Sequence, residues 1–257
     1  MTGLRSALFN LFFFASTFVL ALSGVWLRMF ARHRISDLVK LWARVEIAAV
    51  RVLCGIRLEV SGREHVPSGG ALIAAQHQST FDTLVWFLLL PECSYVTKRE
   101  LTRIPLFGPL IRPAGSVVVD RTAGAIALRG LVRDARRVLA QGRQIVIFPE
   151  GRRAEPGHAL AIQPGIAALA ASTGMPVVPV LTDSGRFWGR RAFRKRAGTI
   201  RIEVLPPLPP DLPRRVLTTT LQDLFIGASR PVDKVVDRTF PSLPTSPSRE
   251  PEPIDQT

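Results

Sequence analysis

The sequence contains very little cysteine, with only Cys54 and Cys93 in 257 residues. Two thiols are too few for a disulfide framework, and they lack the spacing of a cysteine-based zinc site. We therefore expect both to be small apolar residues of the core, with a single bond between them as the alternative. The chain is long enough to bury a hydrophobic core without covalent cross-links.

Acidic residues and lysines are scarce as well. The chain has 20 Asp and Glu against 34 Lys and Arg, which gives a formal net charge of +14, and only four of these cations are lysines. Hydrophobic residues still make up 47% of the sequence, so a wholly disordered chain is excluded. The basic excess indicates an anionic partner, which is a nucleic acid, a phosphorylated small molecule or an anionic membrane surface.

Charge is missing altogether between Arg5 and Arg28. At about 1.5 Å rise per residue, a helix over this apolar stretch would reach the roughly 30 Å of a bilayer's hydrocarbon core. We expect a membrane anchor whose carboxyl side stays in the cytoplasm, because Arg28, Arg32 and Arg34 follow at once. A signal peptide cleaved near residues 21–23 and a buried core helix are the alternatives.

An amphipathic helix is expected directly after the anchor, over residues 36–53. Apolar residues recur there at three- and four-residue steps, while Lys40, Arg44 and Arg51 fall on the other side. Such a helix either packs against the core or lies on anionic headgroups, and the pattern leaves both open. Residues 1–54 are thus predicted to form an anchor followed by an amphipathic helix.

Short β-branched runs alternate with helical patterns from Ile56 onward. This alternation is typical of an α/β fold, here a mixed or parallel central sheet flanked by helices. We expect the domain to span residues 55–240, and the proline-rich residues 241–257 to form a disordered tail. The expected strands are 56–60, 71–75, 94–97, 116–119, 144–148, 177–181 and 199–205, and the expected helices are 80–90, 123–140, 165–172 and 214–228.

A histidine and an aspartate stand where the second expected strand gives way to a helix. Histidine is a suitable general base near neutral pH, and a carboxylate can fix its tautomer and stabilise the imidazolium. Within one helix the two side chains would lie on different faces, so the pair requires His77 in the loop and Asp82 in the first turn, after an N-cap at Ser79. The spacing Ser79-x-x-Asp82 is also a capping box, in which Asp82 merely closes the helix end.

Two more polar segments follow expected strands, at positions where open α/β sheets usually bind ligands. Arg121 follows one strand, with Lys98 earlier in the chain, and another strand leads into Phe148-Pro149-Glu150-Gly151-Arg152-Arg153. Glycine lets the backbone approach a ligand closely, and arginine binds phosphate oxygens in a forked geometry. Each segment taken alone is equally compatible with a solvated turn.

In their order along the chain, these segments resemble the motifs of the bacterial 1-acylglycerol-3-phosphate acyltransferases, within the wider glycerolipid acyltransferase family. The resemblance covers roughly residues 55–210. It rests on His77-x4-Asp82, on Lys98-Arg99-Glu100-Leu101 and Ile104-Pro105-Leu106-Phe107-Gly108 with Val119-Asp120-Arg121, on Phe148-Pro149-Glu150-Gly151, and on Val178-Pro179-Val180.

The resemblance implies an acyltransferase in which His77 is the general base and Asp82 orients it. The acceptor hydroxyl would attack the thioester of acyl-CoA or acyl carrier protein directly, without an acyl-enzyme, a metal or another cofactor. The implied acceptor is lysophosphatidic acid, acylated at its sn-2 hydroxyl to give phosphatidic acid. Its phosphate would be held by the predicted substrate-binding residues Arg121, Glu150, Gly151 and Arg153, with Lys98 as a further candidate.

Two residues depart from the family's pattern. The family usually has Asn before the catalytic His and Thr within Pro-Glu-Gly-Thr-Arg, where this chain has Gln76 and Arg152. An added cation can change the preference for the acceptor, so another lysolipid such as a lyso-ornithine lipid is the alternative substrate. A basic membrane-binding protein without catalysis is the alternative from another class. The segment 178–180 is expected either to shape the acyl-chain side or to pack in the core.

A strongly basic segment lies between Ser184 and Ile202, with aromatic residues among its cations and no acid. This mixture suits a membrane interface or contact with the acyl donor, a single-stranded nucleic acid or a solvated loop. Beside the family resemblance, an anionic membrane surface is the expected partner rather than nucleic acid. The expected location is the cell inner membrane, with the catalytic domain on the cytoplasmic face. The segment contains Arg186, Phe187, Trp188, Arg190, Arg191, Phe193, Arg194, Lys195, Arg196 and Arg201.

Overall fold

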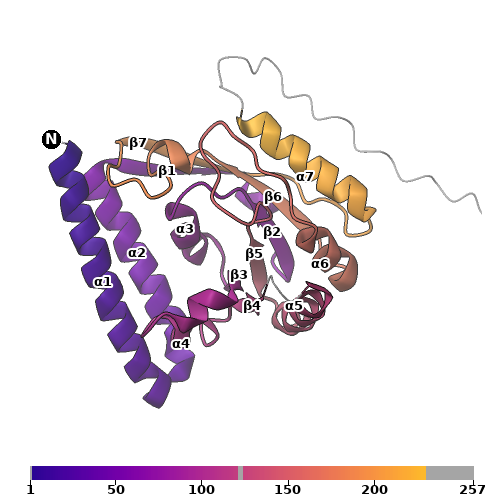
Figure 1. The fold of residues 1–257 in the computed structure, drawn as a ribbon, viewed down its shortest axis with the longest axis horizontal. Helices are drawn as coiled ribbons and strands as arrows, with labels where there is room; N and C mark the ends of the chain where they lie inside the picture. The colour runs from indigo at the N-terminus through magenta and orange to yellow at the C-terminus, as the bar shows by residue number, and fades with distance from the viewer. Residues whose placement is uncertain (1, 121–123, 230–257) are drawn as a thin grey trace, which may run out of the picture.

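A computed structural model describes residues 2–120 and 124–229 (Figure 1). A seven-stranded sheet lies between two groups of helices, with a hydrophobic cluster on each of its faces. The expected α/β architecture is therefore confirmed. The tail expected over residues 241–257 lies outside the described part of the chain.

The sheet is mixed, in the order β1-β7-β6-β2-β5-β3-β4. Neighbouring strands from β6 to β4 are parallel, whereas β7 runs antiparallel to β6 and parallel to β1. Five parallel strands therefore end at one edge of the sheet, where the residues that follow them can meet. All seven expected strands are found within one residue at either end. They are β1 Ile56–Ser61, β2 Ala71–Ala75, β3 Cys93–Lys98, β4 Val117–Val119, β5 Gln144–Ile147, β6 Val177–Thr182 and β7 Gly198–Val204.

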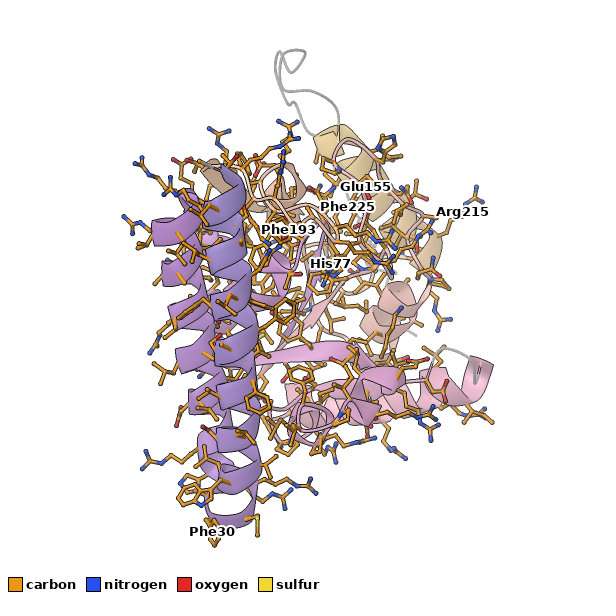
Figure 2. All side chains as sticks on the ribbon, turned by 60° about the vertical axis from the view of Figure 1, so that its left-hand side comes forward. Phe30, His77, Glu155, Phe193, Arg215 and Phe225 are labelled. Atoms are coloured by element: carbon orange, nitrogen blue, oxygen red, sulfur yellow. The ribbon has the colours of Figure 1, made fainter. Side chains whose placement is uncertain are left out.

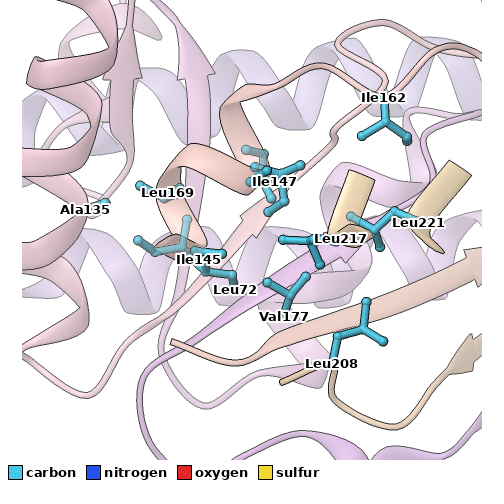
Figure 3. Close-up of a cluster of buried hydrophobic side chains, with 14 of the residues drawn as sticks. Leu72, Ala135, Ile145, Ile147, Ile162, Leu169, Val177, Leu208, Leu217 and Leu221 are labelled. Atoms are coloured by element: carbon cyan, nitrogen blue, oxygen red, sulfur yellow. The ribbon is translucent and has the colours of Figure 1, made fainter. Parts of the chain in front are cut away.

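One face of the sheet is covered by α5 (Gly124–Leu139), α6 (Gly165–Thr173) and α7 (Arg214–Ser229). Figure 3 shows this core, in which Leu72 and Ile145 from the sheet gather with Leu169 from α6 and Leu217 from α7. Successive β2 residues point to opposite faces, and all five are buried, as expected for a parallel strand between two helical layers.

The other face is covered by α1 (Thr2–Phe30), α2 (Ile35–Cys54) and α3 (Phe81–Leu89). The helix α2 buries Ile35, Val39 and Val50, which confirms a core-facing role for one side of this helix. Lys40 on α2 donates a hydrogen bond to the carbonyl of Pro91, 2.7 Å away, so this side chain binds within the domain and not to a lipid headgroup. Both cysteines are free and buried, as expected of core residues.

The helix α1 is long and apolar enough to cross a membrane, and only 22% of its most apolar window is buried. It packs along α2 at one side of the molecule (Figure 1). An apolar band nevertheless stays uncovered on this helix. The exposed large hydrophobic residues of α1 are Leu4, Leu8, Leu11, Phe12, Phe14, Phe18, Val19, Leu22, Trp26, Met29 and Phe30.

A short helical stretch between β3 and β4 was not expected from the sequence. It contains a 3-10 helix over Arg99–Arg103 and α4 over Gly108–Ile111. The chain turns so tightly that a Cβ at position 108 would lie 2.1 Å from the carbonyl oxygen of Thr102, so only glycine fits there. Hydrophobic periodicity cannot reveal segments this short.

Candidate active site

His77 lies in the loop between β2 and α3, and Asp82 lies in the first turn of α3. The Nδ1 atom of His77 is 3.2 Å from Oδ2 of Asp82, so the predicted pair is present. With the Nδ1 hydrogen donated to this carboxylate, Nε2 keeps its lone pair and can accept a proton. His77 also lines a large cavity, which places this base beside a space for substrates.

Asp82 closes the end of α3 while it contacts His77. Its Oδ2 accepts hydrogen bonds from the backbone N–H groups of Gln78 (2.7 Å) and Ser79 (2.8 Å). The hydroxyl oxygen of Ser79 accepts the N–H of Phe81 at 3.0 Å, although the helix itself begins one residue later than expected, after Thr80. Capping and catalysis are therefore not alternatives, because the backbone donors hold the carboxylate against the imidazole.

The His77 loop is held by the residues that follow the neighbouring strand β5. The imidazole stacks on Phe148, with ring centroids 4.0 Å apart and planes inclined by 16°. The His77 N–H donates to Oε2 of Glu150 at 3.0 Å, and its carbonyl accepts the N–H of Ala154 at 2.7 Å. The ring and the backbone of the base are thus both held in place.

Glu150 is buried, and both of its carboxylate oxygens accept backbone hydrogen bonds. Oε2 receives the N–H of His77, and Oε1 receives the N–H of Leu160 at 3.2 Å. Burial raises the pKa of the Glu150 carboxyl, and the two N–H donors partly oppose that rise. Glu150 is absent from the cavity wall. In this geometry it positions the His77 loop, whereas the resemblance implied a substrate contact.

Two glutamines that flank His77 hold the loop from the other side, and sequence reasoning missed both. Gln76 donates to the carbonyl of Phe225 in α7 at 3.2 Å and accepts the N–H of Thr182 at 3.1 Å. Gln78 accepts the N–H of Gly185 at 3.2 Å. The one available signal was polarity next to a buried strand, and it gives no indication of the distant partners.

The cavity has a volume of about 1010 Å³ and extends over the strand ends from one helical layer to the other. In Figure 2, His77 lies between α1 and Arg215, which marks the start of α7. Much of the wall is apolar and suits a hydrocarbon chain. Its apolar residues include Leu20, Trp42, Phe87, Leu110, Leu131 and Ile166.

Three of the predicted substrate-binding residues line this cavity, namely Lys98, Gly151 and Arg153. Gly151 has a φ of +73°, which favours glycine at this turn. Arg153 is half-buried, and this burial lowers the pKa of its guanidinium. Within the described residues, neither Lys98 nor Arg153 forms an ion pair. Arg121, predicted to bind the same phosphate, lies outside the described residues.

Arg99 and Arg152, next in sequence to Lys98 and Arg153, do not line the cavity. Arg99 is bound to Asp120, with 2.8 Å between Nη1 and Oδ2. Arg152, one of the two departures from the family's pattern, is exposed and is not part of the cavity wall. Val178 and Val180 are buried in the core next to α1–α3, so the packing alternative holds for that segment.

The prediction that the whole basic segment faces lipid is wrong for Lys195 and Trp188. Lys195 is only 4% exposed, and its ammonium donates to Oδ1 of Asn10 and to the carbonyl of Phe193. Trp188 is buried edge-on against Phe9 of α1, with ring centroids 5.1 Å apart. These two residues fasten α1 to the domain. The arginines of the segment are exposed: Arg186, Arg190, Arg191, Arg194, Arg196 and Arg201.

Known proteins are similar to this chain in sequence and in fold. The family model described as Acyltransferase matches residues 57–183. The chain is 33% identical over 208 residues to a 1-acyl-sn-glycerol-3-phosphate acyltransferase of Pseudomonas aeruginosa, covering 80% of this chain and 81% of that one. It is 32% identical over 169 residues to 1-acyl-sn-glycerol-3-phosphate acyltransferase alpha of Homo sapiens, covering 65% of this chain and 60% of the human protein.

A solved structure has the same fold. It is the crystal structure of the 1-acyl-sn-glycerophosphate acyltransferase PlsC from Thermotoga maritima, which superposes with a TM-score of 0.72 at 20% identity. The match covers 93% of this chain and all of the other.

Proposed function

The chain belongs to the acyltransferase family, and on that premise we propose that it acylates the sn-2 hydroxyl of lysophosphatidic acid to give phosphatidic acid. The observation that carries the proposal is the shared cavity. It contains a histidine base with its carboxylate partner, an apolar wall for acyl chains, and cations that form no ion pair with a described residue. The names of the relatives point to the same substrate.

The proposed reaction is a direct acyl transfer. His77 Nε2 takes the proton of the acceptor hydroxyl as its oxygen attacks the thioester carbonyl carbon. The C–S bond then breaks, the new ester keeps the acyl group, and the imidazolium returns the proton to the leaving thiolate. Asp82 stabilises the imidazolium while it is charged, because its carboxylate lies at Nδ1. No cofactor other than the acyl donor is needed in this scheme, and the donor is either acyl-CoA or acyl carrier protein.

The acceptor phosphate is the proposed partner of Lys98 and Arg153. Both line the cavity that contains His77, and neither forms an ion pair with a described residue. A phosphate would supply the charge-assisted hydrogen bonds that these side chains can form. A lyso-ornithine lipid lacks a terminal phosphate, so these two cations favour lysophosphatidic acid over that alternative.

We propose that α1 attaches the enzyme to the inner membrane, with the catalytic domain on the cytoplasmic side. The apolar band on α1 is exposed; the exposed cation Arg28 lies in the last turn of this helix, and the exposed cations Arg32 and Arg34 follow it. Cleavage of α1 as a signal peptide would remove Phe9 from its contact with Trp188, which supports retention of the helix. Phe193, 58% exposed among the arginines of the basic segment, suits the headgroup region.

The test is an acyl-transfer assay of the full chain in membranes, with a panel of lysolipid acceptors and both donors. We expect lysophosphatidic acid to be the preferred acceptor and His77→Ala to abolish transfer while the protein stays in the membrane fraction. Turnover retained by His77→Ala would contradict the mechanism. A preference for a phosphate-free lysolipid would contradict the acceptor.

A further inference from the structure

A second pair of cations lines the same cavity, on another element. Arg214 and Arg215 begin α7, and both side chains are exposed. They form part of the cavity wall together with Thr218 and Thr219 of the following turn and with the start of α6. The cavity that contains His77 therefore meets positive charge at two separate places.

Neither arginine of this pair is neutralised by the described part of the protein. The acid nearest in sequence, Asp211, forms no ion pair with them, and α7 has no acid in its first turn. The hydroxyls of Thr218 and Thr219 donate to the carbonyls of Arg214 (2.8 Å) and Arg215 (2.9 Å), so they belong to the helix. The two guanidinium groups remain available for an anion.

The position of the pair separates it from the lipid side of the molecule. The helices α7 and α1 lie on opposite sides in Figure 1, and in Figure 2 His77 lies between α1 and Arg215. The exposed apolar band is on α1. A lysolipid would approach from the α1 side, whereas a water-soluble anion would reach the arginine pair from solvent.

We propose that Arg214 and Arg215 bind the phosphate at the end of the pantetheine arm of the acyl donor. This inference rests on the proposed function. CoA and acyl carrier protein both present their thioester on a phosphopantetheine arm, so this phosphate is the anion that the two donors share. His77 and the arginine pair line one cavity, so an arm that has its thioester at His77 can lie along this cavity towards the forked donors of the pair. The acceptor phosphate stays with Lys98 and Arg153.

The experiment compares the wild-type chain with the double variant Arg214→Gln/Arg215→Gln on three donors: acyl-CoA, acyl carrier protein, and acyl-pantetheine, which lacks the phosphate. We expect the double variant to raise KM about tenfold or more for both phosphate-bearing donors, since charge-assisted hydrogen bonds are lost. We expect the same kcat/KM as wild type with acyl-pantetheine and an unchanged KM for lysophosphatidic acid. Arg129→Gln is the matched control, because Arg129 is exposed on α5 and does not line this cavity.

Three outcomes would overturn the proposal. An equal loss with acyl-pantetheine would mean that the substitutions disturb the fold. A raised KM for the acceptor would assign the pair to the lysolipid, and a loss with acyl-CoA alone would assign it to the nucleotide part of CoA. Calorimetric titration with CoA, without turnover, tests the pair separately. If wild type binds CoA and the variant does not, the donor site stands even where lysophosphatidic acid fails as acceptor.

Discussion

Two regions of the molecule each hold a cation away from water without an ion pair to any described residue. One is the active-site edge, the edge of the sheet where His77, Glu150 and Arg153 lie; the other is the joint, where Lys195 and Trp188 hold α1 to the domain. Burial lowers the pKa of Arg153 at the first and of Lys195 at the second. Their surroundings differ. The Lys195 ammonium has oxygen acceptors and lies 5.4 Å from the ring centroid of Phe9 and 5.3 Å from that of Trp188. The Arg153 guanidinium faces the cavity and makes no hydrogen bond to the described residues.

The comparison teaches how to separate a structural cation from a binding cation. A charge removed from water is costly unless hydrogen bonds replace its hydration. Lys195 has that replacement within the protein, so its joint is complete as it stands. Arg153 lines the cavity with His77 and has no hydrogen bond to a described residue, which fits the proposed contact with the acceptor phosphate. Substitutions in the two regions should therefore affect different properties of the enzyme.

The largest effect is expected from Asp82→Asn at the active-site edge. The amide oxygen can still accept the N–H groups of Gln78 and Ser79, so the start of α3 is kept. The same oxygen also faces Nδ1 of His77, so the variant keeps these contacts but loses the negative charge that fixes the tautomer and stabilises the imidazolium. We expect kcat for acyl transfer to fall by roughly 10³–10⁴-fold, the scale known for this change in a histidine–aspartate pair. Steady-state kinetics checks this.

A circular dichroism spectrum and an unchanged membrane fraction serve as controls for the folding of Asp82→Asn. Near-normal turnover by a folded variant would show that Asp82 only caps α3. The active-site edge would then be a structural cluster, like the joint at Lys195.

The next effect concerns Arg153. If this cation binds the acceptor phosphate alike in the ground state and the transition state, Arg153→Ala should raise KM for lysophosphatidic acid with little change in kcat. The expected loss is about 1.5–3 kcal/mol, or roughly 10–150-fold, the range for a hydrogen bond to a charged group. Arg152→Ala is the matched control, since it removes an equal charge from an exposed neighbour. Equal effects of both variants would mean that overall charge, not a specific contact, attracts the acceptor.

The sequence predicted most of the active-site edge because its information is local. Each parallel strand is a short β-branched run, and the residues that follow these runs meet at one edge by topology alone. Asp82 is five residues from His77, and both the helix cap and the catalytic pair could be read from that spacing. Glu150 was found as a motif residue, but its contact with the His77 backbone depends on the direct pairing of β2 with β5, which the sequence does not reveal.

The joint at Lys195 could not be predicted for the opposite reason. The side chain of Lys195 contacts Asn10, which is 185 residues away in sequence, and its backbone N–H contacts Ser6, which is 189 residues away. In sequence, Lys195 lies between Arg194 and Arg196, which are exposed, and no pattern marks it as buried. Charge clusters are normally solvated, so one member that turns inward is visible only in the fold.

A smaller effect is expected from Lys195→Met at the joint. The substitution removes a buried charge but leaves Oδ1 of Asn10 without its donor, at a cost of about 1–3 kcal/mol. We expect faster hydrogen exchange at residues 6–13 of α1, while kcat/KM for acyl transfer changes little. Arg194→Met, at the exposed neighbour, should leave exchange unchanged. The double variant Asn10→Leu/Lys195→Met should recover part of the protection, because both partners are then apolar. Normal exchange in the single variant would refute the joint.

The smallest effect concerns Glu150, which belongs to the active-site edge but has a structural role like that of Lys195. Burial raises the pKa of the Glu150 carboxyl, so the native state binds the proton more tightly than the unfolded chain does. In the unfolded chain a glutamate has a pKa of about 4.3. This contribution to the free energy of unfolding is complete below that pH and is lost as the pH rises through the native pKa. Glu150→Gln removes it, so the stability of wild type relative to the variant should fall from pH 4 towards pH 7. Chemical unfolding across this range measures the difference, with the exposed Glu155→Gln as control. A difference that grew with pH would mean that the backbone donors outweigh burial, and that Glu150 holds the His77 loop as a stable carboxylate.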